Sequence, residues 1–401
     1  MTGGHGDEAA RGLLGEAWRD FARRIGDSAA TVAGAGFADN ERDLAEGHRY
    51  LARLIAFAIQ EAFCFSDPDF PAFHRGLDPL APWGAPNVDN IYSTAVIDGR
   101  HAYRVWGNVA SIDGFILNLN EGVFPVFPGF RTSQEISSRE LQIGANGEFE
   151  LLLSAERPAD WNGNWMPLQP ADQKFSIRQY LTDWDRHQPA DLHIARVGNE
   201  GAAPLPLNAA RTAAALSEAV GWAQTLASYY LKRLDSERAE RTVNVLPPPV
   251  RKVPGSAYTH YGIAFFDLAD DEALLIEMPV LPAPYWSFQI YNLWNEFTDP
   301  FNRLTSVNHR QAQIDDDGVL RLVIAYRDPG TANWLDTAGQ RRGYLWYRWV
   351  WADAVPTPVA TLTKLGALQG LLPTGTKRCD AAARRAQIAG RRQHLESRYY
   401  R

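Results

Sequence analysis

Tyr285-Trp-Ser-Phe-Gln-Ile-Tyr-Asn292 alternates apolar and polar residues, as a half-buried strand does. Two more apolar and aromatic segments follow at 320–326 and 344–351, and the loops between the three are rich in Asn, Asp, Gly and Pro. Aromatic and β-branched residues are enriched in strands, whereas these loop residues favour turns. Residues 285–351 therefore predict one antiparallel sheet.

The same layout occurs earlier in the chain. Four anchor positions recur at separations of 169 to 171 residues: Gly147 with Gly318, Arg157 with Arg327, Asn164 with Asn333, and Arg178 with Arg348. The earlier copy contains short apolar segments separated by turn sequences, and they lie at 91–97, 102–107, 115–119, 141–143, 149–154 and 175–181. Such spacing is typical of a sandwich or barrel. The recurrence predicts two related β modules in tandem.

Helical periodicity flanks and separates these modules, at 8–26, 40–63 and 208–241. From residue 376 arginines recur every seven positions, which places them along one side of a helix. The predicted fold class is mainly β, with two tandem antiparallel β-sandwich (jelly-roll-like) modules and N-terminal, inter-module and C-terminal helices. The predicted domains are a helical N-terminal cap at 1–75, the first module at 76–200, a connecting helix and Pro-rich linker at 201–250, the second module at 251–360, and a basic helical tail at 361–401.

Composition excludes several classes of protein. A chain of 401 residues exceeds the usual single core, so two or more domains are expected. A net charge of −7 argues against general nucleic-acid binding, and two distant cysteines, Cys64 and Cys379, provide neither a disulfide framework nor zinc spacing. No run approaches the ~18 apolar residues of a membrane span, and the polar N-terminus lacks a signal-peptide core. A cytoplasmic location without a membrane partner is expected.

One stretch resembles a known family. Asp78-Pro79, Trp83-Gly84, Asn87-Val-Asp89-Asn90-Ile-Tyr92 and Ile97-Asp98-Gly99 are similar to the N-terminal hallmark of bacterial domain-of-unknown-function family 1214. Its companion, family 1254, has a similar motif with Thr where this chain has Asn90. The resemblance covers roughly residues 40–360. It implies a two-module β-sandwich architecture, commonly oligomeric, and very little about chemistry.

The candidate catalytic residues are Asp89, Tyr92 and His260. A carboxylate and a phenol can orient a substrate and move a proton, and histidine titrates near neutral pH. The structural alternative is that Asn87 and Asp89 cap a turn, Tyr92 fills the core and His260 is a structural residue. The candidate substrate-binding residues are polar or aromatic neighbours in the two modules, namely Asn87, Asn90, Tyr261, Asn292, Trp294, Asn295 and Arg303.

Neither a cofactor nor a metal is expected. Phosphate loops, dinucleotide glycine fingerprints, nucleophile elbows and His-Glu-x-x-His motifs are all missing from the sequence. Asp185, His187, Asp191 and His193 are the nearest thing to a metal-ligand group. Their polar context with Pro189 favours a surface connection instead.

Two hypotheses of function stay open. The first is a cofactor-free enzyme (a lyase, isomerase or hydrolase) that acts on a small, largely apolar or aromatic molecule by acid–base chemistry in a pocket lined by aromatics, since 11% of residues are aromatic. The alternative is a non-catalytic carbohydrate- or small-ligand-binding protein. Exposed Trp286, Trp294 and Trp334 would favour sugar binding, whereas an enclosed pocket with His260 or Asp89 would favour catalysis.

A homo-oligomer built partly through the terminal helices is also expected. Residues 377–401 carry eight basic and two acidic side chains, while the whole chain has a net charge of −7. The tail is therefore basic against an acidic body. Ile388 and Leu395 add an apolar stripe beside the arginines, so that the helix can cover apolar surface and pair with carboxylates.

Overall fold

The chain folds into two compact units. The computed structural model describes residues 3–79, 82–122, 131–251 and 256–399. Unit 1 comprises residues 1–83, 91–179 and 190–233, and unit 2 comprises 84–90, 180–189 and 234–401. The sequence assigns 84–90 and 180–189 to the first module, but both segments lie in unit 2. The start of the predicted second module at 252–255 and the end of the tail at 400–401 lie outside the described residues.

Unit 1 contains a β-sandwich. A five-stranded sheet has the order β1-β2-β8-β4-β5, and a four-stranded sheet has the order β7-β6-β3-β9. Val105 and Leu151 of the smaller sheet share one buried cluster with Leu117 and Phe175 of the larger sheet. The strands are β1 (His74–Leu77), β2 (Asn90–Val96), β3 (Tyr103–Asn108), β4 (Gly114–Glu121), β5 (Arg131–Ser137), β6 (Glu148–Ser154), β7 (Asn164–Pro167), β8 (Asp172–Tyr180) and β9 (Asp191–Arg196).

Unit 2 repeats this order with its own strands. Its sheets run β10-β11-β17-β13-β14 and β16-β15-β12-β18. Phe288 of β13, Tyr347 of β17 and Leu322 of β15 lie in its core. The strands are β10 (Val250–Arg251), β11 (Thr259–Asp267), β12 (Glu272–Pro279), β13 (Tyr285–Tyr291), β14 (Ser306–Asn308), β15 (Val319–Ala325), β16 (Trp334–Asp336), β17 (Arg342–Val350) and β18 (Val359–Lys364). The mainly β fold with two sandwich modules is confirmed. The single sheet predicted for residues 285–351 is wrong, because β13 and β17 lie in the five-stranded sheet and β15 lies in the four-stranded one.

The repeated asparagines explain why the anchors keep their spacing. In each unit one strand pairs in parallel with a short edge strand, β6 with β7 and β15 with β16. The Asn164 amide donates to the carbonyls of Gln142 and Glu150 at 2.8 and 2.9 Å. Asn333 donates in the same way to Gln313 and Arg321 at 2.7 and 3.0 Å. In each unit, an asparagine amide at the equivalent position thus holds the short edge strand in place.

Helices cover the sheets. They are α1 (Gly3–Asp27), α2 (Ala29–Ala33), α3 (Glu41–Cys64), α4 (Ala209–Ala239), α5 (Leu368–Leu371) and α6 (Ala381–Tyr399). The Asn40 side chain caps α3 by accepting the backbone N–H of Asp43 at 3.0 Å. In unit 1, Phe21 of α1 and Ala58 of α3 pack with Val220 of α4. No helix in the described ranges combines the length and apolarity needed to cross a bilayer.

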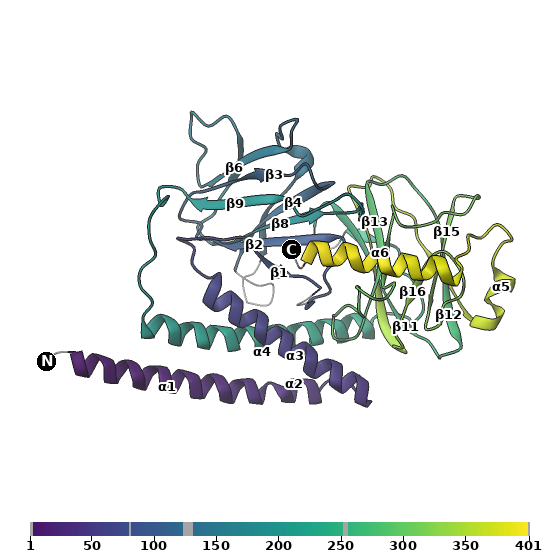
Figure 1. Cartoon of the computed structure of the whole chain (residues 1–401), viewed down its shortest axis with the longest axis horizontal. Helices are drawn as coiled ribbons and strands as arrows, with labels where there is room; N and C mark the ends of the chain where they lie inside the picture. The colour runs from purple at the N-terminus through teal and green to yellow at the C-terminus, as the bar shows by residue number, and fades with distance from the viewer. Residues whose placement is uncertain (1–2, 80–81, 123–130, 252–255, 400–401) are drawn as a thin grey trace. The chain divides into compact units, whose positions relative to one another are not determined.

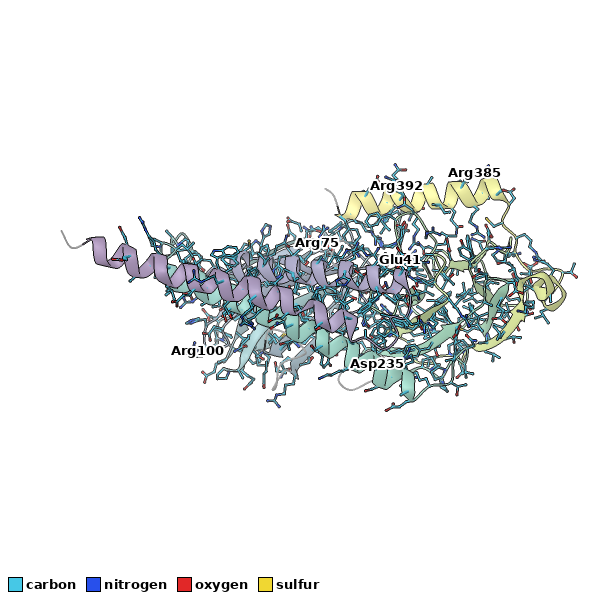
Figure 2. The ribbon with its side chains drawn as sticks, turned by 90° about the horizontal axis from the view of Figure 1, so that it is seen from below. Glu41, Arg75, Arg100, Asp235, Arg385 and Arg392 are labelled. Carbon is cyan, nitrogen blue, oxygen red and sulfur yellow. The ribbon has the colours of Figure 1, made fainter. Side chains whose placement is uncertain are left out.

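The basic tail forms α6, which docks on unit 2 of its own chain (Figure 1). Arg384, Arg391 and Arg398, each seven residues apart, are buried together with Leu395. Figure 2 shows Arg385 and Arg392 on the side of α6 that faces away from the strands, and other arginines of the helix face inward. The predicted C-terminal helix is confirmed, and the row of arginines at 384, 391 and 398 lies on its buried side.

Some strand predictions were wrong or missing. Residues 141–143 are not a strand, because Ser137 and Glu140 form a capping box that starts a 3₁₀ turn (Ser138–Glu140) just before them. In unit 1, the strands β1, β5, β7 and β9 were not predicted. Each lies at a sheet edge and carries few fully buried residues, so its sequence lacks a clear apolar face.

Candidate functional site

A buried polar cluster lies on one face of the larger sheet of unit 2. Its centre is Asp89, which is 1% exposed. One carboxylate oxygen accepts hydrogen bonds from Trp184 Nε1 at 2.7 Å and Asn308 Nδ2 at 2.9 Å, and the other accepts from the Tyr285 hydroxyl at 2.8 Å. Burial, and then the charge of Asp89, raise the pKa of Tyr285 above its usual value, so the phenol stays protonated. These residues form the Asp89 cluster.

Asn87 holds the same segment against β13. Its Oδ1 accepts the backbone N–H of Asp89 at 3.0 Å, which is the turn geometry of the structural alternative. Its Nδ2 donates to the Tyr285 hydroxyl at 2.7 Å, and Gln289 Nε2 donates to its Oδ1. The backbone N–H of Val88 donates to Gln289 Oε1 at 3.1 Å. These hydrogen bonds of Asn87 and Asp89 all join groups of the protein itself, and they hold this segment in place.

A pocket of about 270 Å³ lies beside α6 in unit 2. Its walls come from α6, from β14 and β16, and from the segment 180–189. Gly390 contributes space, because a Cβ atom added there would meet nothing within 4 Å. The main lining residues are Trp184, Ser306, Val307, Trp334, Arg391 and His394. We call this cavity the α6 pocket.

Arg391 and His394 give the α6 pocket its electrostatic character. Burial, followed by the nearby Arg398 and Arg391, lowers the pKa of His394 to about 3, so its ring is neutral near pH 7. Its Nε2 is buried without a hydrogen-bond partner in the described part of the chain. Burial also lowers the pKa of Arg391 to about 10, which still leaves it charged near neutral pH. The pocket therefore combines a cation with an unsatisfied ring nitrogen.

Trp184 links the two features. Its indole N–H donates to Asp89, and its ring stacks on His394 with centroids 5.1 Å apart and planes 16° apart. The guanidinium of Arg391 lies 4.6 Å from the centroid of the same ring. Asp89 does not line the α6 pocket, but it holds the tryptophan that does. It is a positioning residue.

The three predicted catalytic residues lie on different elements. His260 pairs in register with Trp349 and so lies on the row of β11 that faces the sandwich core. Its neighbour Tyr261 lies on the opposite face, in the row of Arg348 and Ser287. Burial, and then Arg251, lower the pKa of His260, which disfavours its charged form. Tyr92 lies on β2 in unit 1, where the Arg178 guanidinium is 5.6 Å from its ring centroid.

The predicted binding residues do not gather at one cavity either. Asn292 accepts the backbone N–H groups of Trp294 and Glu296, both at 3.0 Å, and forms a turn. Asn295 accepts the Tyr344 hydroxyl at 3.0 Å. None of these residues lines the α6 pocket.

Asn90 and Arg303 are also engaged within unit 2. The backbone carbonyl of Asn90 accepts the Tyr399 hydroxyl at 3.2 Å, and its side chain is buried. Arg303 already pairs with the carboxylate of Asp336 at 2.8 Å.

The stretch considered for a metal is divided. Asp185 and His187 lie in unit 2, whereas Asp191 and His193 lie in unit 1, and His193 stacks on Trp106 with centroids 5.3 Å apart. No three histidine, cysteine, aspartate or glutamate side chains among the described residues come together as metal ligands would.

The two structural criteria set for the functional hypotheses are both unmet. Trp286, Trp294 and Trp334 are 3%, 1% and 8% exposed, so they offer no open groove for sugars. The α6 pocket, in turn, is lined by neither His260 nor Asp89.

Sequence reasoning missed Trp184, Arg391 and His394 as site residues. A signal was present for two of them, because positions three apart on a helix share a face and His394 follows Arg391 by three. No local pattern identifies Trp184, since it reaches the site only through the fold of unit 2.

Known proteins match this chain in two ways. Residues 126–183 match the model of the family described as protein of unknown function DUF1214, and residues 250–317 match that of protein of unknown function DUF1254. Neither match covers the stretch at 78–99 on which the resemblance was first based. No curated protein matches the chain.

The chain is also similar to proteins of known structure. The crystal structure of an uncharacterized protein from Burkholderia cenocepacia is 31% identical, with a TM-score of 0.82 over 89% of this chain and 99% of that chain. A protein from Vibrio parahaemolyticus is 14% identical, with a TM-score of 0.45 over 78% of this chain and 99% of that chain. The two family matches and the relative from Burkholderia cenocepacia show that the chain belongs to the proteins of unknown function that carry DUF1214 and DUF1254 regions.

Proposed function

We propose that unit 2 binds a small organic molecule in the α6 pocket. The observation that carries the proposal is the buried Nε2 of His394, which lines the pocket and lacks a hydrogen-bond partner among the described residues. Leaving a buried polar atom unsatisfied costs about 1–3 kcal/mol, and among the buried atoms of this kind His394 Nε2 belongs to a residue that lines the pocket. A bound molecule would supply the missing partner.

The size and lining of the pocket favour a small ligand with an apolar part. Its volume of about 270 Å³ lies just below the ~300–1,000 Å³ usual for ligand sites. Leu304, Val307 and Trp334 offer apolar surface, while Ser306 and Gln387 offer hydrogen-bonding groups. This mixture suits a molecule with one polar end.

Binding without turnover fits the geometry better than acid–base catalysis. Both oxygens of Asp89 accept hydrogen bonds from protein side chains, and Asp89 lies outside the lining. A general base works best when its pKa lies near the working pH. The pKa of about 3 makes His394 a weak base in the free protein. Non-catalytic small-ligand binding is therefore the preferred function.

Acid–base catalysis remains the second candidate because of His394 alone. A ring nitrogen that lines a pocket could accept a proton from a bound substrate if a neighbouring anion raised its pKa. Product formation, followed by NMR for each ligand that binds, separates the two candidates. Turnover that His394→Phe abolishes would favour the enzyme.

A pocket-filling variant tests the proposal. Gly390→Phe places a ring where an added Cβ meets nothing within 4 Å, so α6 can accommodate the change. Ala389→Phe is the matched control, since Ala389 is exposed on the same helix and does not line the pocket. Fragments that raise the melting temperature of the unmodified chain and the control are expected to have no effect on Gly390→Phe. Equal responses in all three proteins would refute the pocket as the binding site.

A further inference from the structure

Resting on the proposed function, we propose that the ligand of the α6 pocket is a small carboxylate with an apolar body. Its carboxylate would bind the Arg391 guanidinium and the Nε2 of His394. Its apolar part would lie against Leu304, Val307 and Trp334.

Arg391 is a buried cation whose protein partners are all uncharged. It is 6% exposed. Its Nε donates to the Pro300 carbonyl at 2.6 Å, and its two terminal nitrogens donate to the Ser306 carbonyl at 3.3 Å and the Ser306 hydroxyl at 2.6 Å. A guanidinium has five N–H donors, so two remain for a ligand. Within the described ranges, Arg391 forms no ion pair with a carboxylate.

The neighbouring arginine of α6 shows what a paired cation looks like here. Arg384, one heptad earlier and equally buried, forms an ion pair with Asp328 at 2.9 Å. Burying a charge is costly unless it is paired. The contrast between Arg384 and Arg391 indicates that the missing anion at Arg391 comes from outside the chain.

The groups around His394 favour an anion as well. Arg391 and Arg398 approach it from α6, and His187 approaches it from the segment 180–189. Asp185 also lines the pocket, but its side chain is exposed. Asp89 and Asp299 are close enough to raise the pKa of Arg391, although burial outweighs them. The two arginines are the charges that act on His394 itself, so an anion is the favoured partner for its ring.

A carboxylate fits this charge better than a larger anion does. Its planar pair of oxygens matches the donors of a guanidinium. The neutral ring of His394 can donate one N–H from Nε2 to the same group. The apolar walls would leave an inorganic phosphate with unsatisfied oxygens.

Isothermal titration of the full chain with matched carboxylates and carboxamides tests the inference. The pairs are benzoate with benzamide and butanoate with butanamide. Inorganic phosphate is the control for an anion that has no apolar part. At neutral pH each carboxylate is expected to bind at least about tenfold tighter than its carboxamide, as one charge-assisted hydrogen bond would give. Phosphate is expected to bind more weakly than either carboxylate.

The outcomes separate this inference from the proposed function. Equal affinities within each pair would overturn the carboxylate and leave small-molecule binding intact. Phosphate binding tighter than both carboxylates would also overturn it, in favour of an inorganic anion. If none of these compounds binds and Gly390→Phe behaves as the unmodified chain with every fragment, both proposals are refuted.

Two variants assign the contact. His394→Phe keeps a ring on Trp184 but removes Nε2, so it should weaken benzoate binding about tenfold and change benzamide binding less than about twofold. Arg385→Gln, on the exposed side of the same helix, should change neither. Circular dichroism first establishes that both variants fold. Unchanged benzoate affinity in His394→Phe would overturn the assignment.

Discussion

Replacing Asp89 by Asn is expected to destabilise unit 2 by about 2 to 4 kcal/mol. The carboxylate accepts three side-chain hydrogen bonds of 2.7, 2.9 and 2.8 Å. Bonds to a charged acceptor are worth about 1.5–3 kcal/mol, against about 0.5–1.5 kcal/mol for neutral pairs, so each of the three loses about 1 kcal/mol. The Tyr285 hydroxyl can turn to the Ser287 hydroxyl at 2.7 Å, which limits the loss when an amide replaces the second oxygen.

Urea unfolding of Asp89→Asn measures this loss. Because two units can unfold separately, a single transition cannot be assumed. Hydrogen exchange read by mass spectrometry should therefore place the loss of protection in β13 and β14. Asp316→Asn is the control, since Asp316 is 83% exposed and pairs with Lys377 at the surface. Such a pair is worth about 0–1 kcal/mol.

Two results would refute the reasoning. A loss below about 0.5 kcal/mol in Asp89→Asn, or one equal to the loss in Asp316→Asn, would show that the buried carboxylate does not hold unit 2 together. Lost ligand binding at unchanged stability would show that Asp89 acts on the ligand directly.

Four other substitutions test three separate parts of the structure. His394→Phe should make the stability of the protein less sensitive to acid. The pKa of His394 is about 3 in the folded chain and near 6.5 in the unfolded chain, so the unfolded chain binds more protons between these two values. The unmodified protein therefore loses on the order of 1 kcal/mol of stability per pH unit as the pH falls through this range. Equal losses between pH 7 and pH 5 in urea titrations of both proteins would contradict this. Gly390→Ala should raise the free energy of unfolding by about 0.5–1 kcal/mol, because alanine favours a helix over glycine and the new Cβ meets nothing within 4 Å. A lowered melting temperature would argue against open space at this position. Asn333→Ala should cost about 2–4 kcal/mol and Asn164→Ala less, since Asn333 is the more buried of the two; chemical denaturation giving the reverse order would contradict it.

The sequence predicted the modules because their inner strands carry a repeated apolar face. Strands such as β13 and β15 alternate or are continuously apolar, and the Asn164 and Asn333 anchors kept the repeat in register. Edge strands such as β5 were not predicted, because few of their residues are buried and their sequences show no clear apolar face. Periodicity reports which face of an element is buried, and says nothing about what covers it.

The site was harder to predict from the sequence, because periodicity does not show which distant residues meet. The structural alternative of a turn cap fits Asn87, whose side chain accepts the backbone N–H of Asp89, yet the partner of both residues on β13, Tyr285, lies about two hundred residues away. The α6 pocket depends on the docking of α6 beside Trp184, which no local pattern encodes. The homo-oligomer remains a prediction. The arginine and Leu395 face that motivated it, however, is already used within its own chain.

The composition of unit 2 from separated segments has a consequence for protein synthesis. Asn87 leaves the ribosome 198 residues before Tyr285, to which it donates a hydrogen bond. At about 5–20 residues per second, that interval lasts on the order of 10 to 40 seconds. During this time the nascent chain holds the segment 84–90 without β13, while the remaining residues of unit 1, up to 233, are made. Unit 1 can thus fold early, whereas unit 2 cannot be completed before α6 is synthesised. If the ribosome stalls before residue 381, the segment with Asp89 is present but the α6 wall of the pocket is missing.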